Sequence, residues 1–390
     1  MKAFIAPGAT LGVVGGGQLG RMFAHAAQQM GYAVAVLDPD ADSPAGGVAQ
    51  RHIRADYLDD AALTQLGETC AAITTEFENV PAQALATLAQ GRPVAPSAAA
   101  VAICQDRAAE KAHFAGSGVP CAPYAVIETL AQLDAVADDL LPGILKTTRF
   151  GYDGKGQVRV KTRAELKAAW VDLRGVPCVL EKMLSLQGEI SVIVARSATG
   201  AIVHFPVQQN LHRDGILAVT ESPAGSVPAD VQRRAIEAAE HVAASMDYVG
   251  VLCVEFFLLQ DGVLVANEMA PRPHNSGHHS IDSCDVSQFD LQVRAMTGAP
   301  LVMPRLHSPC VMLNLLGDLW FAANGSEAIA ETAPDWAGVL ALPGVHLHLY
   351  GKSSARRGRK MGHLTVTAAT AEAAGRTARA VAALLGIESW

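Results

Sequence analysis

The stretch LGVVGGGQLGRM, residues 11–22, decides how the chain begins to fold. A short apolar run leads into Gly15, Gly17 and Gly20, whose G-x-G-x-x-G spacing is typical of the turn between strand and helix in dinucleotide-binding folds. The helical pattern QLGRMFAHAAQQMG follows, and after it come the apolar runs AVAVLD, AAITTEF and PVAPS. This alternation of strands and helices predicts a parallel, doubly wound sheet.

The pattern changes after about residue 105. We expect a helix over residues 105–118, two strands with a glycine-rich loop over 143–161, and two more strands within 176–197. A helix within 231–246 precedes two strands joined by a turn at residues 260–262, so this region is predicted to form an antiparallel sheet. A strand-rich tail and a helix ending at Gly386 complete the chain. The predicted domains are residues 1–105, 106–300 and 301–390.

Composition excludes several classes of protein. The 390 residues carry a formal net charge of −8 without any long basic run, which argues against a nucleic-acid partner. Seven cysteines, an odd number without a C-x-x-C pair, argue against a disulfide framework and a thiolate zinc site. No apolar run approaches the roughly 18 residues of a membrane span. We therefore expect a cytoplasmic protein with no membrane or nucleic-acid partner.

The strongest local signal is LKTTRFGYDGKGQ, residues 145–157. Lys146 ends an apolar strand. The loop that follows contains three glycines in the six residues 151–156, namely Gly151, Gly154 and Gly156. Glycines allow backbone N–H groups to turn toward a phosphate, and a lysine adds positive charge. The loop therefore predicts a phosphate site, although it lacks the spacing of a Walker A loop. The alternative is a flexible hairpin tip.

Two glutamates stand inside apolar strands. Glu255 lies in VLCVEFFLL and Glu268 in VLVANEMA. A buried charge is costly unless it is paired or bound to a cation, and neighbouring strands of a hairpin can bring both carboxylates to one ion. Magnesium, which takes oxygen ligands and nucleotide phosphates, is the expected ion. The alternative is two glutamates that face solvent.

A loop with two prolines, EMAPRPHNSGHH, follows Glu268. It carries Arg272, His274, Asn275 and the histidines at 278 and 279, and we expect it to bind an anion or substrate. Its histidine spacing matches no metalloprotease helix, so a zinc site is disfavoured. For the last two histidines, the alternative is a purely structural role.

Two further segments carry charged residues. In YGKSSARRGRK, basic residues gather in an otherwise acidic chain. Such a cluster suits the binding of a phosphate monoester. The alternative is a solvated turn. In TTEFENV, Glu76 and Glu78 follow a strand at the edge where parallel sheets bind ligands.

Taken together, GGGQLGRM, TTEFENVP, QDRAAEK, LKTTRFGYDGKGQ, NEMAPRPHNSGHH and YGK–GRKMGH resemble the ATP-grasp family of 5-(carboxyamino)imidazole ribonucleotide synthases, from about residue 10 to 365. The resemblance implies an α/β fold, α+β overall, with a Rossmann-like N-terminal domain, a central ATP-grasp domain and a small C-terminal domain. It also implies the carboxylation of 5-aminoimidazole ribonucleotide by bicarbonate in de novo purine synthesis, with ATP and Mg²⁺ as cofactors. Members are typically cytoplasmic homodimers.

The resemblance assigns roles residue by residue. The ATP-binding residues would be Arg107, Lys146, Gly151, Tyr152, Asp153, Gly154, Lys155, Gly156, Gln157, Glu181, Lys182, Met183, Leu184, Glu189, His212, Asn267 and Glu268. The magnesium ligands would be Glu255 and Glu268. The ribonucleotide would contact Gln18, Leu19, Glu76, Asn275, Lys352, Arg359 and Lys360. Bicarbonate would lie near Arg272, His274 and Lys352, and Asp153 or Tyr152 would orient the substrate amine or take its proton.

Other functions share some of these features. A nicotinamide-dependent oxidoreductase would use Asp38, 18 positions after Gly20, for a ribose, but it accounts only for residues 11–38. A formate-using glycinamide ribonucleotide transformylase carries Asp where this chain has Asn275 and Glu where it has Gln18. A biotin carboxylase is another ATP-grasp alternative. A non-catalytic nucleotide sensor is a further alternative, and the pair Glu255 and Glu268 argues against it. The resemblance leaves Asp38 without a ligand.

Overall fold

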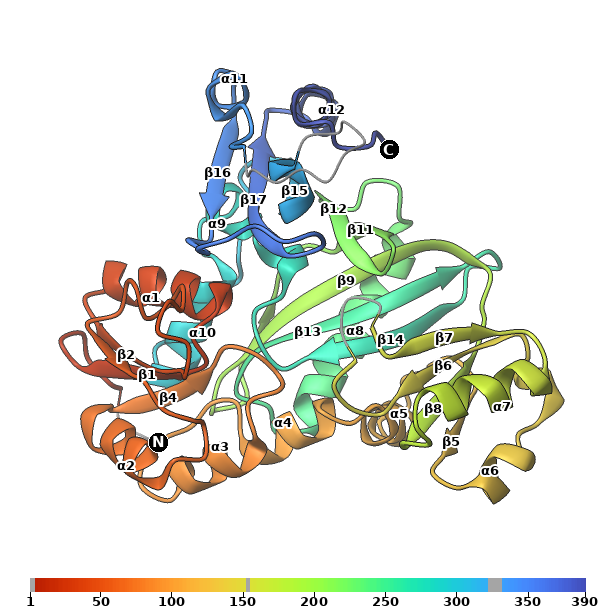
Figure 1. Cartoon of the computed structure of the whole chain (residues 1–390). Helices are drawn as coiled ribbons and strands as arrows, with labels where there is room; N and C mark the ends of the chain where they lie inside the picture. The colour runs from red at the N-terminus through yellow and green to blue at the C-terminus, as the bar shows by residue number, and fades with distance from the viewer. Residues whose placement is uncertain (1–3, 152–154, 322–331) are drawn as a thin grey trace.

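The N-terminal part of the chain forms a parallel sheet (Figure 1). The structure is a computed structural model that describes residues 4–151, 155–321 and 332–390. The strands of this sheet, β1 (Thr10–Val14), β2 (Ala33–Leu37), β3 (Arg51–Ile53) and β4 (Ala72–Thr75), are arranged in the order β3-β2-β1-β4. Alternate strand residues face opposite sides, so α1 (Gln18–Gln29) covers one face while α2 (Asp60–Thr69) and α3 (Ala82–Ala89) cover the other (Figure 1). The prediction of a parallel, doubly wound sheet is confirmed.

One expected strand is missing from this sheet. In PVAPS, Val94 forms only an isolated bridge to Ile73. Pro93 and Pro96 lie on either side of this valine, and proline has no N–H with which to extend a ladder. The prediction of a full strand there was wrong.

A helix from much later in the chain completes the N-terminal core. α10 (Gln288–Thr297) packs beside α1, and its Phe289, Val293 and Met296 belong to the same apolar cluster as Leu11 and Val34. The two segments lie side by side in Figure 1 although more than 250 residues separate them. The N-terminal sheet therefore depends on the middle of the chain for its cover.

A small antiparallel sheet carries the glycine-rich loop. Its strands are β5 (Tyr124–Ile127), β6 (Gly143–Thr147), β7 (Gln157–Val160) and β8 (Cys178–Lys182), in the order β5-β8-β6-β7. α6 (Leu130–Asp134), the 3-10 helix η1 (Asp138–Leu140) and α7 (Arg163–Asp172) pack on it. The predicted hairpin around the glycine loop is thus confirmed.

The remaining strands form one nine-stranded sheet. Its main path runs β14-β13-β9-β11-β12-β15-β17-β16, and β10 pairs with β9. The bounds are β9 (Leu186–Arg196), β10 (Ile202–His204), β11 (Gln208–Arg213), β12 (Ile216–Ser222), β13 (Gly250–Leu259), β14 (Leu264–Ala270), β15 (Cys310–Leu316), β16 (Val345–Leu349) and β17 (Lys360–Thr367). Because β12 pairs with β15, the sheet continues across the domain boundary predicted at residue 300. That boundary remains a prediction.

Helices cover this large sheet and connect it to the other two. α8 (Ala229–Ser245) packs on β9 and β13, and α12 (Ala371–Leu385) packs on β15 and β17, ending at Gly386 with a φ of 67°. α5 (Arg107–Gly116) has Asp106 as its N-cap, and the Asp106 carboxylate accepts hydrogen bonds from two helix amides at 3.0 and 3.3 Å. The other short helices are α4 (Ala98–Cys104), η2 (Asn275–Gly277), α9 (Ser280–Ser283), η3 (Gly317–Trp320) and α11 (Trp336–Leu340).

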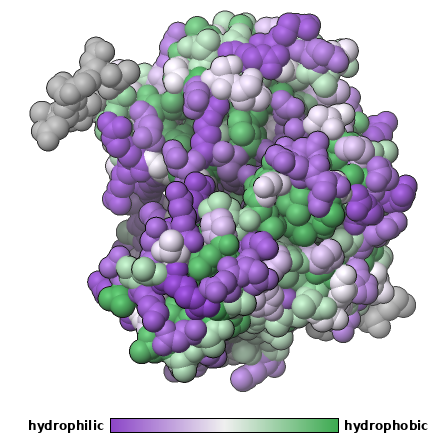
Figure 2. All heavy atoms as spheres, turned by 90° about the vertical axis from the view of Figure 1, so that its right-hand side faces the viewer, coloured by the Kyte–Doolittle hydropathy of each residue, from purple (hydrophilic) through white to green (hydrophobic). Residues whose placement is uncertain are grey.

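The surface is mixed in character. On the face shown in Figure 2, hydrophilic residues lie between several separate hydrophobic areas. Within the described ranges, every helix is too short or too polar to cross a membrane.

Candidate active site

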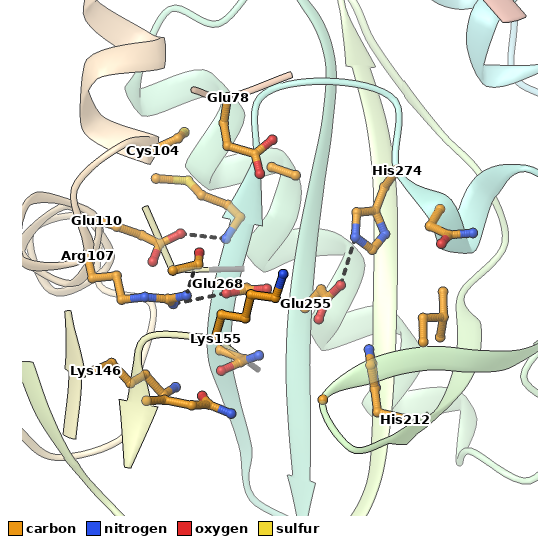
Figure 3. Close-up of a pocket in the computed structure, with 18 of the residues that line it drawn as sticks. Glu78, Cys104, Arg107, Glu110, Lys146, Lys155, His212, Glu255, Glu268 and His274 are labelled. Carbon is orange, nitrogen blue, oxygen red and sulfur yellow. Dashed lines mark hydrogen bonds and ion pairs between the residues drawn. The ribbon is translucent and has the colours of Figure 1, made fainter. Parts of the chain in front are cut away.

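A cavity of about 710 Å³ lies where the three sheets meet. Figure 3 shows side chains from the small sheet, from β13 and β14 and from the loop after β14 pointing into it. The predicted site residues that line it are Arg107, Lys146, Gly151, Lys155, Gln157, Glu189, His212, Glu255, Asn267, Glu268, Arg272, His274, Asn275 and Lys360.

The other predicted residues lie elsewhere. Within the described ranges, the cavity lining does not include Gln18, Leu19, Glu76, Gly156, Glu181, Lys182, Met183, Leu184, Lys352 or Arg359. Tyr152, Asp153 and Gly154 lie outside the described residues, so the structure says nothing about their predicted roles.

The two strand glutamates are directly paired across β13 and β14. Glu255 and Glu268 are register partners, and both face the cavity. Glu255 Oε1 lies 2.9 Å from His274 Nε2, and Glu268 Oε2 lies 3.0 Å from Arg107 Nη1. The Glu255 side chain is only 11% exposed, whereas that of Glu268 is 43% exposed where it faces the cavity.

Both glutamates are ionised at neutral pH. Burial favours the neutral acid, but His274, His212 and Lys360 hold the pKa of Glu255 at about 2. Burial acts likewise on Glu268, whose pKa is nevertheless kept below its usual range by the guanidinium of Arg107. Two anionic oxygen ligands on adjacent strands suit magnesium. Since the described residues contain no group of three His, Cys, Asp or Glu side chains able to hold a metal, an ion here would need phosphate or water ligands as well.

A buried network of charges lies on the opposite side of the cavity. Lys146 Nζ lies 2.8 Å from Glu181 Oε2, and Lys111 Nζ lies 3.2 Å from Glu181 Oε1. Lys111 also donates a hydrogen bond of 2.9 Å to the carbonyl of Asn267. Burial lowers the pKa of Lys146, although Glu181 opposes this effect. Thus Glu181, predicted only as part of the adenine linker, also holds Lys146.

Lys111 was missed by sequence reasoning. It is fully buried in α5, four residues after Arg107, so the two side chains lie on the same face of the helix. The segment QDRAAEK contains both, but the family resemblance assigns a role only to the arginine. The i, i+4 spacing of the two basic residues was the signal that could have identified it.

The segment predicted to bind adenine follows β8 directly. The amides of Lys182 and Met183 donate hydrogen bonds of 2.9 Å to the carbonyls of Pro123 and Pro142. These bonds hold the segment against the small sheet beside the cavity. Its contact with adenine remains a prediction.

His212 and Glu189 form a second charged pair at the rim of the cavity. His212 Nδ1 lies 2.5 Å from Glu189 Oε2 on the adjacent strand. Burial alone would lower the pKa of His212, but the bond to Glu189 and the charge of Glu255 raise it. A histidine held in this way can present positive charge to an anion.

The loop after β14 is tied to the N-terminal domain. Arg272 forms a close ion pair with Glu78, which comes from TTEFENV, and Glu78 raises the pKa of the buried guanidinium in spite of its burial. Asn275 exchanges two hydrogen bonds with Asn314, at 3.0 and 2.8 Å. Lys352 Nζ donates to the carbonyl of Lys360, the first residue of β17, at 2.5 Å. Arg272, His274 and Asn275 of the predicted anion loop and Lys360 of the basic segment line the same cavity.

The glycine turn at the start of the chain encloses carboxylates of the protein itself. Glu76 accepts hydrogen bonds from the amides of Gly17 and Gly20, at 2.7 and 2.9 Å. Asp38, which had no assigned ligand, accepts from the Gly16 amide and from the Tyr57 hydroxyl, both at 2.7 Å. The carboxyl group of Glu76 thus occupies the amides at which an anion was expected, although burial raises its pKa against the effect of these two hydrogen bonds. Its role toward a substrate remains a prediction.

The two residues that begin α1 differ in their surroundings. Leu19 is packed in the apolar core, whereas Gln18 is half-buried. The Leu19 side chain is therefore unavailable, and only the backbone at this position is left to contact a ligand. Binding by either residue remains a prediction.

Comparisons with known proteins identify the family. The matching family models are the ribonucleotide synthetase preATP-grasp domain over residues 8–105, the ATP-grasp domain over 112–289 and the phosphoribosylaminoimidazole carboxylase C-terminal domain over 310–377. The N5-carboxyaminoimidazole ribonucleotide synthase of Brucella melitensis is 44% identical over 367 residues, which cover 93% of this chain and 98% of the relative.

The chain belongs to the N5-carboxyaminoimidazole ribonucleotide synthase family. Solved structures of N5-carboxyaminoimidazole ribonucleotide synthases have the same fold. An ADP complex of purK matches with a TM-score of 0.89 and 39% identity, covering 98% of both chains. The Aspergillus clavatus enzyme in complex with ADP and 5-aminoimidazole ribonucleotide matches with a TM-score of 0.86 and 32% identity, covering 97% of this chain and 98% of that one.

Membership of the N5-carboxyaminoimidazole ribonucleotide synthase family confirms the ATP-grasp fold and the ligase class. It excludes the oxidoreductase that the glycine turn alone suggested. The turn has the letters of a dinucleotide site, but Glu76 and Asp38 occupy its amides.

Proposed function

We propose that this chain uses ATP to carboxylate 5-aminoimidazole ribonucleotide with bicarbonate, which gives 5-(carboxyamino)imidazole ribonucleotide, ADP and phosphate. The observation that carries the proposal is the pair of ionised glutamates on β13 and β14, which lie between a basic side of the cavity and the Arg272–His274 loop. This is the arrangement of charges that phosphoryl transfer to a small anion requires. The Aspergillus clavatus relative, crystallised with ADP and 5-aminoimidazole ribonucleotide, supports the choice of substrate.

ATP would bind between the small sheet and β14. Arg107, Lys146 and the loop 151–157 would contact its phosphates, residues 181–184 its adenine, and Glu189 its ribose. His212, Asn267 and Glu268 would complete the site. Mg²⁺ held by Glu255 and Glu268 would neutralise charge on the phosphates.

Bicarbonate would bind beside Arg272, His274 and Lys352. Its oxygen would attack the γ-phosphorus of ATP, so that ADP leaves and carboxyphosphate forms, while the cationic side chains balance the developing charge. The glycine loop would exclude water from this intermediate. Carboxyphosphate would then release carbon dioxide and phosphate in place, and the substrate amine would attack the carbon dioxide, with Asp153 or Tyr152 orienting the amine or accepting its proton.

The ribonucleotide would bind at the end of the cavity that faces the N-terminal domain. We assign its phosphate to Lys360, which lines the cavity, and to Lys352 and Arg359 of the same basic segment, because charge-assisted bonds favour phosphate oxygens. Gln18, Leu19, Glu76 and Asn275 would contact the rest of the substrate. We further propose a cytoplasmic homodimer, which light scattering would detect as about twice the chain mass of 40.7 kDa.

One assay tests the function. Phosphate release from Mg-ATP is measured with 5-aminoimidazole ribonucleotide and bicarbonate, and in parallel with glycinamide ribonucleotide and formate. We expect stimulation only by the first pair. Stimulation by neither pair would refute the proposal, and stimulation by the second alone would assign the transformylase reaction instead.

A further inference from the structure

A chain of buried hydrogen bonds connects His274 to the interior of the large sheet. Thr220 Oγ1 donates to Asn210 Oδ1 at 2.9 Å, and Asn210 Nδ2 donates to Ser191 Oγ at 2.9 Å. Ser191 Oγ donates to Ser276 Oγ at 2.8 Å, and Ser276 Oγ lies 2.9 Å from His274 Nδ1. The four residues behind the histidine are all buried. They come from β9, β11, β12 and the 3-10 helix η2, so the chain crosses the sheet and ends at the cavity.

The direction of these bonds determines which nitrogen of His274 carries hydrogen. The backbone N–H of Ser276 lies 3.3 Å from Nδ1, and an N–H group can only donate. The Ser276 hydroxyl accepts from Ser191, so its own hydrogen is available to Nδ1 as well. With Nδ1 as the acceptor, a neutral imidazole carries its hydrogen on Nε2. That atom lies 2.9 Å from Oε1 of Glu255, a carboxylate that only accepts (Figure 3).

Two neighbouring groups compete with this arrangement only weakly. Gln208 Oε1 also lies near the Ser191 hydroxyl, but at 3.2 Å, compared with 2.8 Å to Ser276. The Cys253 thiol lies beside Ser276, and burial raises its pKa well above the usual range, so it is a protonated, weak acceptor.

The backbone of His274 is fixed independently of its ring. Gln288 accepts from the His274 amide and donates to the His274 carbonyl, both at 2.8 Å. The main chain and the ring are thus held by different residues. Mutation of the hydroxyl residues therefore changes the contacts of the His274 ring and leaves the hydrogen bonds of its backbone in place.

We propose that Ser276, supported by Ser191 and Asn210, is a positioning residue that holds His274 as the Nε2–H tautomer. His274 therefore donates a hydrogen bond into the cavity and does not accept a proton there. In this structure the acceptor is Glu255 Oε1; that the same N–H also donates to an oxygen of bicarbonate or of carboxyphosphate during the reaction rests on the proposed function. The base for the substrate amine must then be a different group.

The tautomer is measured without any turnover. Protein labelled with ¹⁵N in histidine, free of metal and nucleotide, is studied by long-range ¹H–¹⁵N correlation at mildly alkaline pH, and the His274 signals are assigned by their loss in His274→Gln. We expect hydrogen on Nε2 and none on Nδ1. Hydrogen on Nδ1 would overturn the proposal, and this outcome is independent of whether the proposed reaction occurs.

Two variants test the hydroxyl chain. Ser276→Ala and Ser191→Ala are each expected to lower kcat about tenfold, equivalent to about 1.4 kcal/mol, with KM for ATP unchanged. Ser276→Ala should also raise the fraction of His274 that carries hydrogen on Nδ1. Wild-type kcat in both variants, or a wild-type tautomer in Ser276→Ala, would show that the hydroxyl has no positioning role.

Ser283→Ala provides a matched control. Ser283 is also buried, and its hydroxyl lies 2.8 Å from Nδ1 of another histidine, His279, which does not line the cavity. This variant should keep the wild-type kcat. If Ser283→Ala loses as much activity as Ser276→Ala, a general effect of removing a buried hydroxyl accounts for both, and the proposal fails.

Discussion

Glu268 is one of the two cavity carboxylates that we propose as ligands of Mg²⁺. Glu268→Gln keeps the size of the side chain but removes one of the two anionic oxygen ligands proposed for Mg²⁺. We expect kcat to fall at least about 100-fold. Mutation of residues that only orient a metal ligand already lowers metal affinity or activity about 10–100-fold, and Glu268 would be a ligand itself. ADP release measures this, and the thermal midpoint reports whether the fold is retained. The control is Glu237→Gln on the exposed face of α8, which should keep its activity. Activity retained in Glu268→Gln would show that Glu268 is not a ligand of the metal.

Glu110 makes the stability of the protein depend on pH. It is buried in α5 and accepts a hydrogen bond of 2.6 Å from the Met269 amide, and burial raises its pKa to about 8. The unfolded chain loses this proton near the ordinary value of 4.5, whereas the folded protein keeps it until about pH 8. Between these values the unfolded state binds fewer protons, so this group's contribution to the free energy of unfolding falls as pH rises, by at most about 1.4 kcal/mol per pH unit.

Glu110→Gln should remove this dependence while it retains an acceptor for Met269. Urea unfolding of the wild type and the variant at about pH 5.5 and about pH 8 measures it. The stability of the variant relative to the wild type should increase with pH. A difference that stays constant across this range would contradict the assignment.

At the scale of elements, η2 is fixed by the close approach of Gly277 to its neighbours. A Cβ at this position would lie 2.2 Å from Cδ1 of Ile193 and 2.6 Å from Oε1 of Gln288. Gly277→Ala must therefore displace η2 from β9 or push away the glutamine that holds the His274 backbone. We expect a loss of about 1–3 kcal/mol in the free energy of unfolding, as for other overpacked sites, together with a lower kcat.

Thermal unfolding and ADP release measure the two effects of Gly277→Ala. The control is Gly225→Ala, where a Cβ would meet no atom within 4 Å and φ is not positive. If Gly277→Ala behaves like this control, the close approach in the structure is not maintained in solution.

At the scale of the whole molecule, the three parts of the chain share their cores and their charges. α10 covers the N-terminal sheet, and the ion pair of Arg272 with Glu78 crosses from the middle part to the N-terminal part. The large sheet also continues from β12 into β15. Damage in the N-terminal core should therefore destabilise the distant C-terminal part.

Leu66→Ala tests this coupling. Leu66 is fully buried in the N-terminal domain between α2 and the sheet, and such truncations cost about 2–5 kcal/mol. All four tryptophans lie outside this domain, at positions 170, 320, 336 and 390. We expect the midpoint detected by tryptophan fluorescence to fall together with the midpoint from far-UV circular dichroism. An unchanged fluorescence midpoint would show that the parts unfold independently.

The sequence by itself determined the elements and the family. Apolar periodicity predicted α1, α5, α8 and the β13–β14 hairpin, because these patterns repeat within a few residues. The order of six motifs identified the ATP-grasp family, and the carboxylates of Glu255 and Glu268 were expected as a pair from the hairpin alone. The strand at PVAPS was the failure at this level, since its prolines leave Val94 with one isolated bridge.

Only the tertiary structure decided what each polar group contacts. The glycine turn predicted an anion, but packing placed Glu76, 56 residues after Gly20, at its amides. Glu78 was noted at a strand end, yet its partner Arg272 lies 194 residues away. Lys111 with Glu181, and Ser276 with Ser191, are likewise brought together only when the sheets assemble. Hydrogen bonds and burial depend on distances in space, and no local pattern in the chain encodes these distances.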